Sequence, residues 1–322
     1  MTEELKLNKA NQDLLDEVND LFPRGSVFVQ FHGEKSGFVR HDQAETTSLP
    51  GGLVITVTDL TEPNYTASHE LLHLLMTLRG FPQIFFELSL GDKQLDEQMM
   101  IMATDLFNTV AHQIVVDQQR QHGLINEQIE QEYFKGITAT LTDEGDQDDG
   151  ERTLRLLALL DALVFYAGGH MTKQQEEELQ RRYPVAWASA QFLYGQAMEK
   201  PVKSPFEMRR TVVKLFRLFD TQLQQWGLPA LHNNQFTSLS PVLSKRQLRL
   251  EVDQVYDIYH SEMTERDSKR RAYVVLGKND QQNAFVLPAP KDEYSSDQML
   301  KFYHQPVEDL LKSQNVPFIL RK

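Results

Sequence analysis

The pattern of apolar and polar positions predicts a helix followed by a small sheet near the N-terminus. Residues 8–22 carry apolar side chains three and four positions apart, which is the spacing of an amphipathic helix. The runs 27–31 and 53–58 are rich in β-branched and aromatic residues and are typical of strands. Residues 38–40 are predicted to be the hairpin partner of the first run.

The rest of the chain is predicted to be mainly helical, with a change of pattern near residue 265. Helical spacing of apolar positions extends over residues 65–78, 96–121, 151–167, 172–181, 184–199, 205–226 and 244–263. Strand-like runs and one further helix follow at 271–276, 284–287, 296–314 and 316–320. We therefore expect an α+β fold with three regions. These are residues 1–145 with the sheet, a helical region 146–264, and a small C-terminal α/β module 265–322.

The composition narrows the choice of partners and of site chemistry. The 322 residues include 33 basic and 46 acidic ones, a net charge of −13, which disfavours nucleic acid as the main partner. There is no cysteine, which excludes disulfides and thiolate ligands, so a zinc site must use His, Asp or Glu. The N-terminus lacks the apolar stretch of a signal peptide, and no run approaches the roughly 18 apolar residues of a membrane span. We expect a soluble cytoplasmic protein without a membrane partner.

The strongest chemical signal is the motif H-E-x-x-H at residues 69–73, inside the predicted helix 65–78. Positions four apart lie on one face of a helix, so His69 and His73 can direct their imidazole nitrogens at a single metal ion. Glu70 follows the first ligand, where a general base acting on metal-bound water is needed. In the alternative interpretation, the leucines of this helix face the core and its histidines merely occupy the surface. The strand and turn before the helix favour the metal site.

Over roughly residues 25–120, this arrangement resembles the zincin metallopeptidases, in which a strand leads through a short loop into a zinc-binding helix. The resemblance implies a hydrolase that holds Zn²⁺ through His69 and His73, with Glu70 as the general base on the zinc-bound water. It also implies a peptide or protein substrate, held in extended form along the edge strand of the sheet.

A catalytic zinc site needs a third protein ligand, which the motif itself does not supply. The metzincins take it from a histidine where this chain has Arg79, and this difference excludes that subclass. The gluzincin motif N-E-x-x-S-D is absent too, but a ligand from a later helix would give a gluzincin-like arrangement. On the predicted helix 96–121, Asp105, Asn108 and His112 form a polar line beside an apolar stripe.

We choose His112 as the third ligand, with Asn108 or Asp105 orienting a ligand imidazole. Asp117, Asp105 and Glu97 are the carboxylate alternatives. In the alternative interpretation, His112 is a core histidine with an ordinary hydrogen-bond partner.

The leading hypothesis is zinc-dependent hydrolysis of a peptide bond. The alternative is a regulatory or interaction protein that uses a zincin-like fold for sensing or docking, with a structural or vestigial metal site. An intact Glu70 favours catalysis, because a purely structural site has no use for a general base. His32 and His170 are weaker candidates for stabilising an oxyanion, and the remaining histidines, His41 among them, show no spacing that suggests chemistry.

Overall fold

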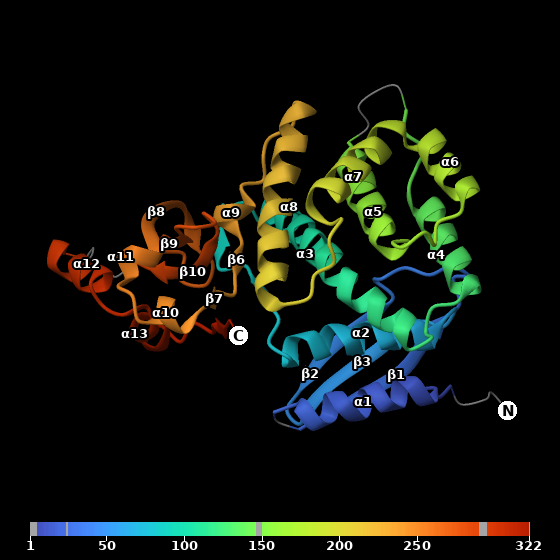
Figure 1. Ribbon diagram of the computed structural model, residues 1–322, viewed down its shortest axis with the longest axis horizontal. Helices are drawn as coiled ribbons and strands as arrows, with labels where there is room; N and C mark the ends of the chain where they lie inside the picture. Colours follow the sequence, from blue (N-terminus) through green and yellow to red (C-terminus); the bar gives the residue numbers. More distant parts are fainter. Residues whose placement is uncertain (1–4, 24, 146–149, 290–294, 322) are drawn as a thin grey trace. The chain divides into compact units, whose positions relative to one another are not determined.

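The computed structural model describes residues 5–23, 25–145, 150–289 and 295–321, and it combines helices with strands in an α+β fold (Figure 1). The chain divides into two units, neither of which is one continuous stretch. The first unit contains the residues up to Arg79 together with Ala111–Gly195, and the second contains Gly80–Val110 together with the residues from Gln196 onward.

This division differs from the three consecutive regions predicted at 1–145, 146–264 and 265–322. Two short strands near the start of the second unit pair with strands far downstream. Ile84 pairs opposite Leu239, and Leu88 pairs opposite Glu265. Long-range pairing of this kind leaves no mark in local composition, so the sequence pattern suggested regions in linear order.

The first unit contains the N-terminal sheet and most of the helices that follow it. Its elements are α1 (Lys9–Leu21), β1 (Ser26–Glu34), β2 (Ala44–Leu49), β3 (Gly52–Asp59), α2 (Pro63–Leu78), the end of α3 (Lys93–Gln121), α4 (Glu127–Thr140), α5 (Arg152–Phe165), α6 (Lys173–Arg182) and α7 (Pro184–Ala197).

The three-stranded sheet of the first unit has the order β1-β3-β2, with β1 parallel and β2 antiparallel to the central strand. Alternate residues of β3 face opposite sides of the sheet, and Ile55 and Val57 are buried on one side. On the other side, Phe28 of β1, which pairs with Val54, is 56% exposed. Helices α1 and α2 pack against each other and against these strands (Figure 1). The buried face of the sheet therefore supports the helix that carries the H-E-x-x-H motif.

The start of α2 is fixed by two asparagines of the first helix. The Asn64 side chain accepts a hydrogen bond from the backbone N–H of Asn8 at 2.8 Å, and the Asn11 amide donates to the Asn64 carbonyl at 2.7 Å. Pro63 occupies the first turn, where its missing N–H costs nothing. These contacts set where α2 begins, and so where its histidines fall.

Three local predictions are wrong. Residues 38–40 are not a strand, because β1 pairs with β3, and the hairpin partner of β3 is β2, whose polar sequence gives no apolar alternation. The predicted helix 244–263 forms only two short helices before its second half becomes a strand. The predicted helix 296–314 is interrupted next to Pro306. Helix α4 was not predicted at all.

The second unit is built round a four-stranded antiparallel sheet. Its elements are β4 (Ile84–Phe85), β5 (Leu88–Ser89), the start of α3, α8 (Pro205–Gln225), α9 (Asn233–Phe236), β6 (Ser238–Leu239), β7 (Val242–Leu243), α10 (Lys245–Leu248), α11 (Val252–Val255), β8 (Tyr256–Glu265), β9 (Arg271–Gly277), β10 (Asn283–Pro288), α12 (Ser296–Tyr303), α13 (Val307–Ser313) and β11 (Ile319–Leu320). The strand order of the main sheet is β10-β9-β8-β5.

Both faces of this sheet are covered. Along β9, Tyr273 and Val275 belong to one buried apolar cluster, while Val274 and Leu276 belong to another. This double burial explains why the strand is apolar at successive positions rather than at alternate ones.

Helix α3 is, among the described residues, the one helix long and apolar enough to cross a membrane by length and composition alone. Of its most apolar window, 56% is buried inside the protein, and the core helices of soluble proteins pass the same test.

Candidate metal centre

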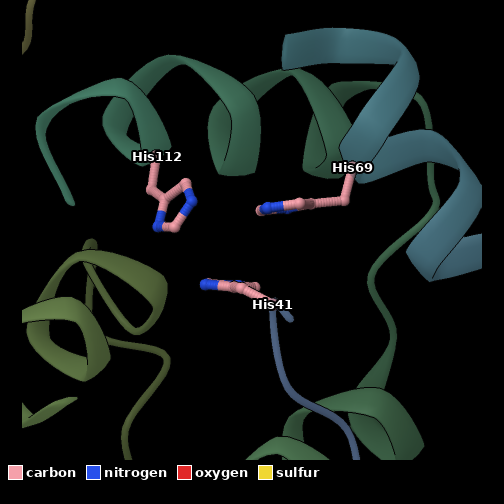
Figure 2. A group of neighbouring side chains, drawn as sticks. All are labelled: His41, His69 and His112. Carbon is pink, nitrogen blue, oxygen red and sulfur yellow. The ribbon is translucent and has the colours of Figure 1, made fainter. Parts of the chain in front are cut away.

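Four histidines from three parts of the first unit come together. His69 and His73 lie one turn apart on α2, His112 lies on α3, and His41 lies in the loop before β2. Figure 2 shows three of them, His41, His69 and His112, with their rings facing one shared space. The three predicted ligands are thus brought together, and a fourth histidine without any sequence signal joins them.

The ring centres of His69, His73 and His112 lie about as far apart as those of three imidazoles round one tetrahedral ion. With zinc–nitrogen bonds near 2 Å, each ring centre lies about 3 Å from the metal, so two ligand rings have centres about 5 Å apart. The observed distances between ring centres are 4.7 Å (His69 to His73), 4.8 Å (His69 to His112) and 5.1 Å (His73 to His112). The ring planes are inclined to one another by 62°, 59° and 77°. Steeply inclined planes can meet at one ion.

Judged by distance alone, His41 could also be a ligand of the same metal ion. One ring nitrogen from each of His41, His69 and His112 lies within 4.8 Å of the other two. However, the His41 and His69 rings are stacked, with centres 4.4 Å apart and planes only 13° apart. A metal lies in the plane of each imidazole that binds it, and two stacked planes do not meet nearby. The inclination of the rings favours His73 as the companion of His69 and His112, whereas the ring nitrogens that converge within 4.8 Å are those of His41, His69 and His112.

The hydrogen bonds of His41 support the same distinction. Its Nδ1 lies 2.7 Å from Asp161 Oδ2 and its Nε2 lies 2.8 Å from the Tyr65 hydroxyl, so both ring nitrogens already have partners. His41 thus lies against the ligand set as a hydrogen-bonded neighbour.

Asp161 on α5 orients the His112 imidazole. Its Oδ1 lies 2.5 Å from His112 Nδ1, while its Oδ2 contacts His41 and accepts a hydrogen bond from Tyr133 at 3.0 Å. A carboxylate on Nδ1 fixes the ring and leaves Nε2 for a metal, which is the usual support of a zinc-binding histidine. The residue that orients His112 is Asp161, whereas the sequence suggested Asn108 or Asp105 as the residue that orients a ligand imidazole.

Asp161 carried a sequence signal that was overlooked. It is the one carboxylate in α5, and every other residue of the helix from Leu156 to Phe165 is apolar. A lone acid in an apolar helix is costly to bury without a partner, so it is a candidate for supporting a site.

The other predicted candidates lie elsewhere. Glu97 is exposed and faces Lys93 at 3.6 Å, and Asp117 is exposed and accepts from Gln121 at 2.7 Å. Asp105 and Asn108 lie on the part of α3 that belongs to the second unit. His170 is half-exposed and pairs with a glutamate, and His32 is exposed.

Burial keeps the imidazoles of His69, His73 and His112 neutral at pH 7. Burial, followed by the adjacent imidazoles, holds the pKa values of His69 and His73 well below the ordinary value of 6.5. Burial also lowers the pKa of His112, against the opposing effect of Asp161. Burial alone would raise the pKa of Asp161, but His112 and His41 outweigh it and hold that pKa well below 3.8. Metal ligation requires neutral imidazole, so this electrostatic environment suits it.

Two buried atoms beside the cluster lack partners. His69 Nδ1 and Gln119 Oε1 are each buried without a hydrogen bond. The Gln119 amide donates to the Tyr65 carbonyl at 3.1 Å and to the Ser68 hydroxyl at 2.7 Å, which holds this side chain next to the motif helix. When His69 carries its proton on Nδ1, Gln119 Oε1 can accept a hydrogen bond from it. The Nε2 atom of His69 is then free to bind a metal.

Glu70 is half-buried on α2, directly after the first motif histidine. Burial raises its pKa to about 7, and nearby His41 opposes this effect. A carboxylate with a raised pKa has the proton affinity that a general base requires.

The loop that carries His41 packs closely on α4. The Val39 N–H donates to the Glu132 carbonyl at 3.1 Å, and a Cβ added at Gly136 would lie only 2.2 Å from the Val39 carbonyl oxygen. The glycine is therefore needed for this approach, and the approach places His41 beside the cluster.

We expect Gly136→Ala to destabilise the fold by about 1–3 kcal/mol, because the added methyl group forces the Val39 backbone away. Gly195→Ala is the matched control, since Gly195 also lies in a helix but has open space round it. That change should be neutral or stabilising by up to about 1 kcal/mol. Urea unfolding of both variants tests the expectation, and equal stability of the two would contradict it.

Comparisons with protein-family models, with curated proteins and with solved structures find no match for this chain. The functional assignment of the site therefore depends on the geometry of its own residues.

Proposed function

We propose that the chain is a zinc-dependent peptidase of zincin type, with a metal site formed by His69, His73 and His112. The observation that carries the proposal is the arrangement of these three rings. Their centres lie 4.7–5.1 Å apart and their planes are steeply inclined, as for imidazoles that share one zinc ion. Three imidazole ligands leave one position of a tetrahedral ion open, which is the coordination of a catalytic zinc site.

A zinc ion held there would polarise a substrate carbonyl and lower the pKa of a water molecule to about 7. The residues of the chain have separate tasks. Glu70 takes the proton of the attacking water and then delivers it to the leaving amine. Asp161 holds His112 in one orientation and keeps its Nδ1 protonated. His41, stacked on His69 and hydrogen-bonded to Asp161, limits the movement of both.

The sheet of the same unit supports a peptide as the substrate. Strand β2 pairs with β3 on one side only, so it is an edge strand with backbone groups available for an added strand. An extended peptide can pair with such an edge through its main chain, as in β-augmentation. The zincin resemblance implies this use of the edge strand.

Metal analysis and a peptide digest test the proposal together. Protein purified without metal-affinity resin should contain close to one zinc per chain, and it should cleave members of a peptide library. Removal of the metal with a chelator should stop cleavage, and added zinc should restore it. Absence of any transition metal would remove the proposed site. One bound zinc without any cleavage would replace the peptidase by a sensing or docking role for the same site.

A further inference from the structure

A cavity of about 580 Å³ lies beside α8, entirely within the second unit. Its volume falls in the range of roughly 300–1,000 Å³ that is typical of small-molecule sites. Val213, Val242 and Val255 contribute an apolar wall, and all three are buried. The cavity is independent of the histidine cluster, which belongs to the first unit.

The lining of this cavity is strongly basic, although the chain as a whole has a net charge of −13. Its cationic residues are Arg209, Arg210, Lys214, Arg217, Lys278 and Arg321. Asp280 is the one carboxylate among the described lining residues. Such a concentration of one sign of charge attracts ligands of the opposite sign.

Three of these cations contact Asp280 or Asp257. Arg209 Nε donates to Asp280 Oδ2 at 3.0 Å, and Arg217 donates to the Asp280 carbonyl. Lys278 Nζ lies 3.3 Å from the Asp257 carboxylate. These residues build the wall of the cavity.

The other three cations have no carboxylate beside them. Arg210 is exposed and has no hydrogen-bond or ion-pair partner among the described residues. Lys214, one helical turn later on α8, donates to the Gln196 carbonyl at 2.6 Å. The Arg321 guanidinium lies over the Phe206 ring, 4.7 Å from its centre. Three positive charges at one cavity thus have no carboxylate partner. A ligand with a single carboxylate group would neutralise only one of them.

Tyr256 lines the same cavity and is 2% exposed. Its hydroxyl oxygen is buried behind the cavity surface and has no hydrogen-bond partner among the described residues. Burial raises the pKa of Tyr256, so the hydroxyl keeps its proton and is able to donate it in a hydrogen bond. Buried polar groups are almost always paired, so this hydroxyl is available to an acceptor that the cavity wall admits.

We propose that this cavity binds a small organic phosphate. Its apolar body lies against Val213 and Val255, its phosphate group is drawn to Arg210 and Lys214, and one of its acceptor atoms meets the Tyr256 hydroxyl. A phosphate monoester carries nearly two negative charges at pH 7, which fits the uncompensated cations better than a carboxylate does.

Calorimetric titration of the full chain with phenyl phosphate tests the ligand class. Phenol, which has only the apolar body, and inorganic phosphate, which has only the anionic group, are titrated separately as controls. We expect saturable binding of phenyl phosphate at least about tenfold tighter than either part, because both halves of the cavity contribute to it. Benzoate should bind at least about tenfold more weakly. Equal affinity for benzoate, or no saturable binding of phenyl phosphate, would overturn the proposal.

Variants locate the binding site. Replacing both Arg210 and Lys214 by Gln should weaken phenyl phosphate binding by about 10–100-fold, as for loss of charge-assisted hydrogen bonds. Arg270→Gln is the matched control, because Arg270 is an exposed arginine of the same unit outside the cavity lining. This control should bind like the wild type, and equal losses in all variants would overturn the proposal.

Tyr256→Phe provides the sharpest test, since it removes only the orphan hydroxyl. The variant should bind phenyl phosphate about fivefold or more weakly. Its unfolding temperature should not fall, because the hydroxyl makes no hydrogen bond in the free protein. A lower unfolding temperature with unchanged affinity would assign the hydroxyl a structural role and contradict the proposal.

Discussion

Glu70→Gln should abolish peptide hydrolysis while zinc binding and the fold persist. Glutamine has nearly the same shape but cannot accept the proton of the attacking water. General acid–base catalysis contributes about 10²–10⁴-fold, and we expect the loss of activity to reach the upper part of that range. The amide is also uncharged, so it tolerates the partial burial that raises the pKa of Glu70 to about 7.

A second carboxylate at the start of the same helix serves as the control. Glu62, the N-cap residue of α2, is half-buried, and burial followed by the Glu132 charge raises its pKa. Glu62→Gln should cleave the peptide library at the wild-type rate. The measurement is the rate of digestion at equal zinc content. Equal rates for Glu70→Gln and the wild type would show that the activity comes from another group or a contaminant.

Zinc affinity should separate the ligand histidines from their neighbour. We expect His73→Phe and His112→Phe each to weaken zinc binding by more than about 100-fold, because each removes a nitrogen from the metal. His41→Phe removes the same atoms from the stacked ring and should weaken binding by less than about tenfold. Asp161→Asn should weaken zinc binding by an intermediate factor of about 10–100, as does the loss of other residues that orient a metal ligand.

The His41 and His73 variants form a matched pair, because each keeps an aromatic ring and loses two nitrogens. Competition with a zinc indicator gives the affinities, and circular dichroism checks that the helices remain. If His41→Phe lost zinc and His73→Phe retained it, the ligand set would be His41, His69 and His112, and the stacked rings would have to separate on binding.

The motif helix and the placement of its two histidines on one face could be predicted because they depend on spacing within one helix. His69 and His73 are four apart, and the apolar residues round them define the helix without reference to the rest of the chain. His112 could be chosen because it belongs to the polar line that runs beside the apolar stripe of α3.

The contacts of Asp161 and His41 with the other site residues were beyond such reasoning, because they depend on tertiary packing. Asp161 lies 49 residues from His112 in sequence, and His41 lies 120 residues from Asp161. Only the packing of the loop before β2 against α4 and α5 brings them together. The edge strand β2 was missed for another reason. Its polar side chains obscure the alternation by which strands are recognised, although its backbone completes a regular ladder.

The interleaved course of the chain between the two units has a consequence for biosynthesis. The short strands β4 and β5 leave the ribosome before residues 111–195 of the first unit, and their partners β6 and β8 follow much later. Until β6 and β8 have been synthesised, Leu88 and its neighbours form an unpaired apolar segment. Chaperones bind such segments, and they aggregate when they remain exposed. Slow synthesis through residues 111–195 should therefore lower the yield of folded protein more than an equal delay after residue 290.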